Sequence, residues 1–351
     1  MEIKVIGSPE TLPAGWDNYL SSHHCGSIFH TGAWQQVVAQ SYPYSFRGLF
    51  AATADGKLTG LFPTWLVRSR LTGNRLISSP FSYICGPLAD DRRIERELVK
   101  QAVDYALEQK LAYLEIKSQQ QLLLLDEGFV ASDKYSTFHL DITADEERIW
   151  KSLHKGIIQR SITKARKEGV STKVADSSDC IGAFHRLNRL TCRRHGIPAQ
   201  PIGFFRMVWK LMATSGMADF LFAYYDGRPI AAIVLFYFKK TATYMYGASD
   251  PHYLQYRPNH LLLWEGIRRA KQKGMRLFDL GRVSTENQGL ADFKRRWGAE
   301  EITLNYYYWP ARKGIGAVDR KSLKYKLSTV IFSKLPIVLT DRLTWLYKHL
   351  A

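Results

Sequence analysis

Two stretches of the chain repeat one pattern of apolar and polar positions. Each begins with a strand-like apolar run, continues through a short turn that contains Asp-Gly, and ends in a second apolar run. The first stretch covers residues 49–67 around Asp55-Gly56, and the second covers residues 221–238 around Asp226-Gly227. Because Asp-Gly between two apolar runs is a strong signal for a tight turn, each stretch predicts a β-hairpin.

A second pattern also occurs twice, in the same order after the hairpins. Apolar residues at helical spacing near residues 95–109 and 259–273 predict two helices. An alternating strand follows each helix without a gap, at residues 111–116 and 275–280. The shared order of hairpin, strand, helix and strand predicts a duplicated α/β unit, in which a mixed sheet is flanked by helices.

The repeat divides the chain into three parts. We expect a first domain over residues 1–140, a second over residues 141–310 and a basic tail over residues 311–351, which follows a Trp-Pro break. Within the tail, residues 328–350 predict two short amphipathic helices separated at Pro336. Such helices suit peripheral contact with an anionic membrane, although packing onto the second domain is the alternative.

Composition excludes several classes of protein. With 351 residues, 46% of them hydrophobic, the chain can bury the core of one large domain or two ordinary ones, and disorder is excluded. The net charge of +17 favours partners that carry phosphate, although many basic proteins bind none. The sequence shows no signal-peptide core, no apolar run long enough to span a bilayer and no CxxC pair, so we expect a cytoplasmic protein.

A basic segment at residues 151–169 opens the second predicted domain, with six Lys/Arg and one Glu. Three apolar residues of this segment fall on one helical stripe: Ile158, Ile162 and Ala165. The cations Lys155, Arg160 and Lys164 form either a phosphate-binding face or an ordinary solvated helix face. No patterned aromatic motif of the kind found in base-stacking modules accompanies them.

Five short segments carry a family resemblance. They are residues 155–160, 244–249, 262–270, 278–281 and 289–298, and the last contains Gly289, Phe293-Lys294 and Trp297-Gly298. Their order and spacing resemble the Fem-type peptidyltransferases, and most nearly the FemAB-related proteins of bacterial envelope and exopolysaccharide systems. The resemblance implies two tandem GNAT-like domains, that is, domains of the acetyltransferase fold. It also implies transfer of an acyl or aminoacyl group to an amine.

The resemblance leaves the donor open. In Fem enzymes the donor is aminoacyl-tRNA and the acceptor is a peptidoglycan precursor that carries a diphosphate, whereas other relatives are associated with acyl-CoA. The glycine loop that binds the CoA pyrophosphate in acetyltransferases is replaced here at residues 255–260, where Pro258 removes a backbone donor. The long charged helical hairpin that some Fem enzymes use for tRNA is also not evident. We expect no tightly bound cofactor and no metal, since no His/Asp/Glu cluster has ligand spacing.

The resemblance and the chemistry of amide formation select three candidate catalytic residues. Lys294 would stabilise the tetrahedral oxyanion or hold a substrate phosphate or carboxylate. Tyr246 would donate a hydrogen bond to the carbonyl or the leaving group. Asp279, which ends a strand before Gly281, would orient Arg282 or accept the amine proton. The candidate substrate-binding residues are Arg160, Lys155, Lys164, Tyr244, Phe293 and Arg282.

Two of these candidates lie on one predicted strand. Tyr244 and Tyr246 alternate with Met245, so we expect them to share one face of the strand, where packing against a helix is equally plausible. Three histidines have no partner that the sequence can place, and we favour them less as bases: His195, His252 and His260.

The sequence therefore predicts an N-acyl or aminoacyl transferase that forms an amide on an amine of a phosphorylated cell-envelope precursor. The precursor would belong to peptidoglycan or exopolysaccharide synthesis, and the donor would be aminoacyl-tRNA or acyl-CoA. The protein would act at or near the inner membrane face. The alternatives are an acyl-CoA-dependent N-acyltransferase that acts on an amino sugar, and a non-catalytic module that binds RNA or anionic lipid through its basic face.

Overall fold

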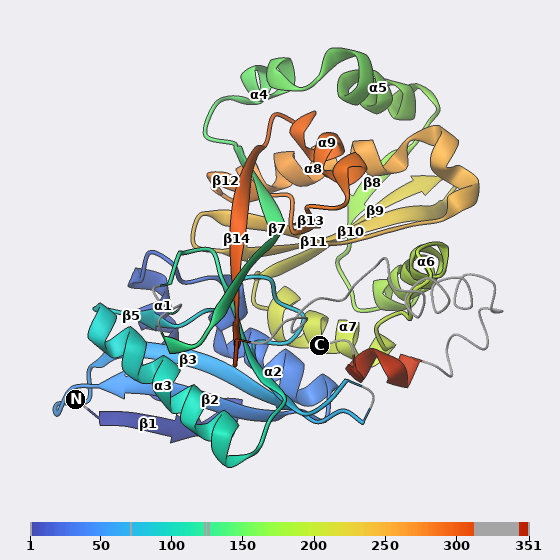
Figure 1. Ribbon diagram of the computed structural model, residues 1–351. Helices are drawn as coiled ribbons and strands as arrows, with labels where there is room; N and C mark the ends of the chain where they lie inside the picture. Colours follow the sequence, from blue (N-terminus) through green and yellow to red (C-terminus); the bar gives the residue numbers. More distant parts are fainter. Residues whose placement is uncertain (1, 71, 123, 125–126, 312–343, 350–351) are drawn as a thin grey trace. The chain divides into compact units, whose positions relative to one another are not determined.

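The structure is a computed structural model that describes residues 2–70, 72–122, 124, 127–311 and 344–349 (Figure 1). Contacts divide these residues into two compact units. Unit 1 holds the described residues up to Tyr135 and from Thr303 to Ala311, together with Lys348 and His349. Unit 2 holds the residues from Ser136 to Ile302 and the described part of the tail up to Tyr347.

Unit 1 is a mixed sheet with helix α3 packed on one face. The strand order is β1, β2, β3, β4, β6, β14, and the short β5 pairs with β3. The strands are β1 (Glu2–Ile6), β2 (Ser45–Ala52), β3 (Leu58–Val67), β4 (Arg75–Ser78), β5 (Leu88–Ala89), β6 (Tyr113–Ser118) and β14 (Glu300–Trp309). The helices are η1 (Pro9–Thr11), α1 (Trp16–Ser22), η2 (Ile28–His30), α2 (Gly32–Ser41) and α3 (Arg92–Glu108).

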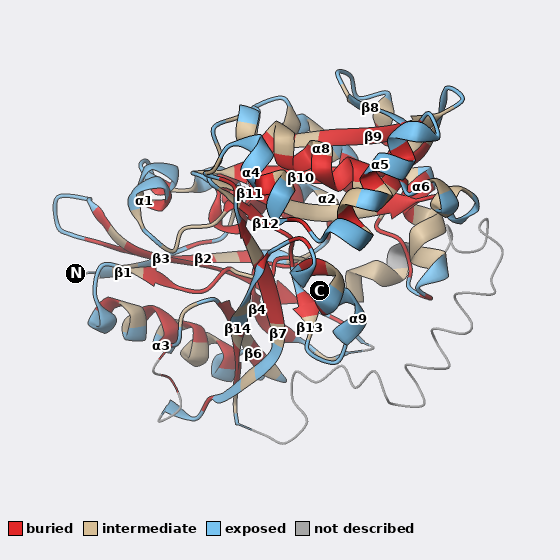
Figure 2. Cartoon of the chain, turned by 90° about the horizontal axis from the view of Figure 1, so that it is seen from above, coloured by how far each residue is buried: buried red, intermediate tan, exposed pale blue. Residues whose placement is uncertain are grey.

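The strands of unit 2 are also mixed in direction and follow the order β7, β12, β11, β10, β9, β8, and the short β13 pairs with β7. The strands are β7 (Val130–Asp141), β8 (Ser171–Val174), β9 (Ala218–Tyr225), β10 (Arg228–Phe238), β11 (Thr241–Ser249), β12 (Leu277–Asp279) and β13 (Val283–Ser284). The helices are α4 (Glu146–Ser152), η4 (Lys155–Gln159), α5 (Arg160–Lys167), α6 (Cys180–Arg194), α7 (Ile202–Val208), η5 (Trp209–Ala213), η6 (Pro251–Tyr256), α8 (Pro258–Gln272) and α9 (Gln288–Arg295). Figure 2 shows the buried side of α8 and the largely buried strands β9 and β10.

The predicted duplication is confirmed by the strand pairing. In unit 1, β2 and β3 form a hairpin, β4 pairs antiparallel with β3, and β6 pairs parallel with β4 after α3. In unit 2, β9 and β10 form a hairpin, β11 pairs antiparallel with β10, and β12 pairs parallel with β11 after α8. The second hairpin closes through Asp226 and Gly227 at φ 48° and 70°, both in the left-handed region that an Asp-Gly turn tolerates.

Each copy places its last strand in the other unit. β7 follows β6 in the chain, but its residues 139–141 pair antiparallel with β12. β14 follows the second copy, but it pairs antiparallel with β6. The compact units therefore divide near residues 135 and 303, whereas the sequence places the domain boundaries at 140 and 310.

The basic segment folds as its apolar stripe predicts. Ile158, Ile162 and Ala165 are fully buried in the core of unit 2, where α5 packs on α8. Gly169 follows the end of α5 at φ 81°, as expected for a glycine after a helix C-terminus.

Most of the predicted tail, residues 312–343 with Pro336, lies outside the described residues. The described end of the tail is the 3-10 turn η7 (Thr344–His349). In the part of the chain that the structure describes, no helix is both long and apolar enough to cross a bilayer.

Candidate active site

A β-bulge in β11 separates the two candidate tyrosines. Tyr246 lies opposite Val234 of β10, while Tyr244 lies opposite the next residue, Leu235, so Met245 is the extra residue. Directly paired residues share a face and successive residues alternate between faces. The expectation that Tyr244 and Tyr246 share one face is therefore wrong, because the bulge shifts the alternation by one residue.

Tyr246 points to the face of the sheet that α6 and α7 cover. Its ring packs edge-on against Phe204 and Phe205, with ring centroids 6.1 Å and 5.4 Å away. Its hydroxyl accepts a hydrogen bond of 3.1 Å from the Gln200 side-chain amide, and burial raises the pKa of Tyr246 well above its usual value. Tyr347 from the chain end also hydrogen-bonds Gln200. Tyr246 is therefore a neutral hydrogen-bonding group. No motif in the sequence indicated Gln200.

Tyr244 points to the opposite face and packs against the core beneath α8. Burial raises the pKa of its phenol to about 12. The ring lies over Gly247, where any Cβ would collide with the tyrosine hydroxyl, and a Cβ at Gly281 would lie 2.9 Å from the Tyr244 backbone carbonyl. Glycine at position 281 therefore lets the turn after β12 approach the backbone of β11.

Lys294 and Asp279 meet across the backbone of Gly281. Lys294, in the last turn of α9, is only 4% exposed, and its Nζ donates a 2.6 Å hydrogen bond to the Gly281 carbonyl. The Gly281 N–H donates a 2.8 Å hydrogen bond to Asp279 Oδ1. Burial lowers the pKa of Lys294 to about 8, although the Asp279 carboxylate opposes the shift. The cation is therefore held in a largely dry site by one carbonyl and a nearby negative charge.

Asp279 also takes partners from β7. The Thr137 hydroxyl donates a hydrogen bond to Asp279 Oδ1, and the His139 Nε2 lies 3.8 Å from Asp279 Oδ2. The ring of Phe138 faces Lys294 with its centroid 5.6 Å from the Nζ. β7 brings these groups because it pairs directly with β12, a pairing that the sequence did not reveal.

Phe293 lies beside the first turn of α8. Its ring packs edge-on against His260 at 5.5 Å and lies 6.2 Å from the ring of Trp297. Burial, assisted by Arg257, lowers the pKa of His260 to about 4, so the imidazole is neutral near pH 7. Phe293 thus packs the last turn of α9 against α8 and helps to place the next residue, Lys294.

The basic candidates are exposed. Lys155, Arg160 and Lys164 lie on the outer side of η4 and α5, and Arg282 is exposed in the turn after β12. The His154 N–H donates a hydrogen bond of 3.1 Å to the Arg296 carbonyl, so the start of η4 lies next to the end of α9. The structure thereby brings the segment of Lys155 near that of Lys294, but it shows no contact between these two side chains.

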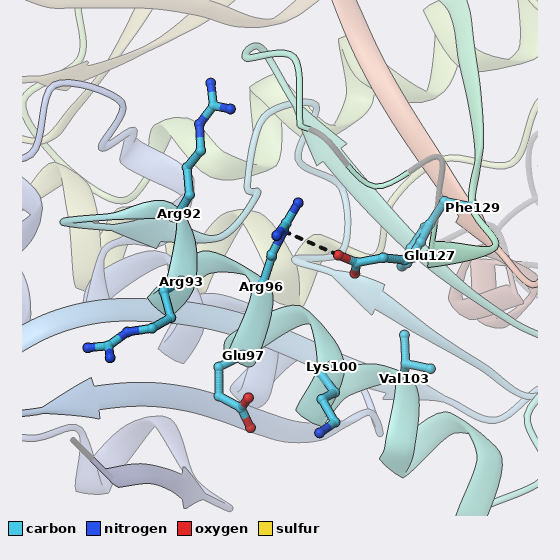
Figure 3. A pocket seen from close by; sticks show the side chains of 8 residues that line it. All are labelled: Arg92, Arg93, Arg96, Glu97, Lys100, Val103, Glu127 and Phe129. Carbon is cyan, nitrogen blue, oxygen red and sulfur yellow. Dashed lines mark ion pairs between the residues drawn. The ribbon is translucent and has the colours of Figure 1, made fainter.

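A groove lies away from these residues, on the outer side of α3 in unit 1 (Figure 3). It has a volume of about 700 Å³, and none of the candidate residues line it. Arg92, Arg93, Arg96 and Lys100 line it, and an ion pair of 3.5 Å joins Arg96 to Glu127. No group of three or more His, Cys, Asp or Glu side chains able to hold a metal occurs within the described ranges.

Comparison with known proteins shows which proteins this chain is similar to. Residues 153–295 match the acetyltransferase (GNAT) domain family. An 88-residue segment is 31% identical to a lipid II:glycine glycyltransferase of Staphylococcus haemolyticus, and it covers 23% of this chain and 21% of that protein. The chain thus spans about a fifth of the length of this curated relative.

Solved structures share the fold over most of the chain. The crystal structure of FemX covers 88% of this chain and 97% of its own, with a TM-score of 0.68 and 15% identity. L-PGS from Bacillus licheniformis covers 93% and 98%, with a TM-score of 0.55 and 14% identity. A tandem GNAT protein from the clavulanic acid pathway covers 88% and 98%, with a TM-score of 0.56 and 12% identity.

These matches and the repeated strand order show a fold of two tandem GNAT-like domains. Residues 153–295, in unit 2, match the acetyltransferase (GNAT) domain family, and the chain is similar to a Fem-type structure in its fold and to a lipid II:glycine glycyltransferase over one segment.

Proposed function

We propose that this protein is an N-acyl or aminoacyl transferase that forms an amide on an amine of a cell-envelope precursor of peptidoglycan or exopolysaccharide synthesis. The observation that carries the proposal is the buried Lys294, held by the Gly281 carbonyl beside Asp279. The GNAT match and the resemblance to a lipid II:glycine glycyltransferase support the reaction class. The precursor would be met at the membrane surface, so the protein would be peripheral on the inner face.

The proposed reaction is attack of a neutral acceptor amine on the donor ester or thioester. A C–N bond forms and the C–O or C–S bond breaks, while the amine proton leaves with the alcohol or thiol. No covalent enzyme intermediate is needed, because close alignment of amine and carbonyl supplies much of the rate. Lys294 would stabilise the oxyanion of the tetrahedral intermediate, and Asp279 would hold the turn that presents this cation.

A donor screen tests the proposal directly. The full chain is incubated with a lipid-linked or nucleotide-linked amine acceptor and with either charged tRNAs or acyl-CoAs, and the product is identified by mass spectrometry. Amide product from one donor class supports the proposal and selects the donor. No amide product from any pair, with the protein folded, contradicts it and favours the non-catalytic alternative.

The pKa of Lys294 predicts how transfer depends on pH. Since the pKa is lowered to about 8, the cation present at pH 7 is lost as the pH rises through 8. At pH 9 about a tenth of the cation remains, so transfer should fall about tenfold relative to a Lys294→Arg variant, which stays charged. The ratio of the two rates removes the titration of the acceptor amine. A ratio that rises with pH would instead assign Lys294 as a base.

The exposed cations of α5 should act in substrate binding. The double variant Arg160→Gln/Lys164→Gln is expected to raise KM about tenfold at low salt and to change kcat little, because two phosphate contacts are lost. The matched control is Arg206→Gln/Lys210→Gln, which removes the same charge from another exposed helical face of unit 2. Steady-state kinetics at two salt concentrations measure the effect, and equal KM changes in both variants would exclude a specific role.

A further inference from the structure

The phenol of Tyr347 lies beside two of the candidate site residues of unit 2. Tyr347 belongs to η7, the dark red turn in Figure 1, and contacts assign the described residues up to Tyr347 to unit 2. Its side chain hydrogen-bonds Gln200, whose amide also bonds Tyr246. It also lies close enough to the exposed Arg282 for that cation to lower its pKa, against the larger effect of burial. Tyr347 therefore stands next to a candidate catalytic residue and a candidate substrate-binding residue.

The side-chain amide of Gln200 connects the two phenols. Gln200 is buried, and its Nε2 donates a hydrogen bond of 3.1 Å to the Tyr246 hydroxyl. The hydrogen bond between Gln200 and Tyr347 favours the ionised phenol, as expected where the amide donates to the phenol oxygen. A side-chain amide has two N–H protons, so one is available for each phenol. Tyr347 thus supplies an oxygen acceptor to a buried donor beside Tyr246.

The turn that carries Tyr347 is of a kind that opens readily. η7 is a 3-10 helix of six residues, and Tyr347 within it is half-buried. Runs longer than about four residues are uncommon for this helix, because its hydrogen bonds are poorly aligned. Surface segments with such weak local structure open at a small fraction of the free energy of global unfolding. Tyr347 can therefore leave Gln200 while unit 2 stays folded.

We propose that Tyr347 is a gate of the candidate active site, closed on Gln200 in this structure and displaced when substrate binds. The proposal rests on the proposed transferase function, and it adds what the incoming group must carry. Loss of Tyr347 removes an acceptor from a buried N–H, which is costly unless another oxygen takes its place. The displacing part of the substrate should therefore present a carbonyl or hydroxyl oxygen to Gln200, next to Tyr246.

Alkylation of Cys192 tests the gate without any turnover, so failure of the proposed transfer reaction would leave this test unaffected. This half-buried thiol lies close enough to Tyr347 for the two to influence each other electrostatically. Cys180, on the same helix α6, is the internal control, because burial raises the pKa of both thiols to about 12. The full chain is treated with iodoacetamide, and mass spectrometry of its peptides gives the rate at each cysteine.

Tyr347→Ala should speed alkylation of Cys192 about tenfold and leave Cys180 unchanged, because access limits the reaction of thiols with similar pKa. Tyr347→Phe keeps the ring but removes the oxygen that Gln200 bonds, so the rate at Cys192 should rise by a smaller factor. This variant also provides the test if Tyr347→Ala fails to fold. Lys348→Gln changes the next residue and should leave both rates at the wild-type level.

Steady-state kinetics with an active donor and acceptor give the second measurement. Tyr347→Ala should lower KM several-fold and leave kcat unchanged, because the substrate no longer has to displace the phenol. The proposal is overturned if the rate at Cys192 stays unchanged in the folded variants of Tyr347. It is also overturned if Tyr347→Ala raises KM, since Tyr347 would then be a fixed part of the site.

Discussion

Lys294→Ala is expected to lower kcat/KM for transfer by about 10²–10³-fold, the usual cost of removing one oxyanion-stabilising group. The side chain is a buried cation that donates a hydrogen bond to the Gly281 carbonyl, so a neutral oxygen and not water solvates its charge. A developing oxyanion would give this cation a stronger partner than it has in the resting site. The benefit therefore arises mainly in the transition state, and KM should change less than kcat.

Three variants separate the charge of Lys294 from its packing. Lys294→Met keeps most of the volume without the charge and should be as inactive as Lys294→Ala, with a smaller loss of thermal stability. Lys294→Arg keeps the charge and should retain part of the activity. Lys210→Ala removes an exposed lysine of the same unit and should behave as the wild type. Wild-type kcat in a folded Lys294→Met variant would remove Lys294 from the mechanism.

The repeat was predictable from sequence because its signals are local. The turn at Asp226-Gly227 needs residues that tolerate positive φ, and the buried sides of α3 and α8 need only helical spacing. The hairpin and the helix followed by a strand each occur twice in the same order, and this was sufficient to predict the duplicated unit. The exchange of β7 and β14 was not predictable, since strand partners depend on contacts between residues far apart in the chain.

The candidate site was predictable only in part, because its contacts also join residues that lie far apart in the chain. Lys294 and Asp279 were selected from separate motifs, but their link runs through the backbone of Gly281, which no side-chain pattern encodes. The bulge at Met245 inserts one residue and reverses the face of Tyr244 relative to Tyr246. Gln200 bonds Tyr246 from a loop that carries no motif.

Gly281→Ala is expected to destabilise unit 2 by about 2–4 kcal/mol and to remove most of the transfer activity. Gly281 has φ 78°, which costs an alanine about 1–2 kcal/mol. A Cβ there would also lie 2.9 Å from the backbone carbonyl of Tyr244, which cannot rotate away as a flexible side chain could. The turn must shift, and this turn supplies both the carbonyl that holds Lys294 and the N–H that holds Asp279.

Gly274→Ala is the control for backbone strain alone. Gly274 has φ 73°, so an alanine suffers the same backbone strain, but no atom lies within 4 Å of its Cβ position. The free energy of unfolding of the Gly274→Ala variant should fall by about 1–2 kcal/mol, and the kcat of this variant should stay at the wild-type level. Denaturant unfolding and kcat, measured on both variants, separate strain from displacement of the turn. Equal losses of stability and full activity in both would mean that the contact between Gly281 and Tyr244 neither constrains the turn nor positions Lys294.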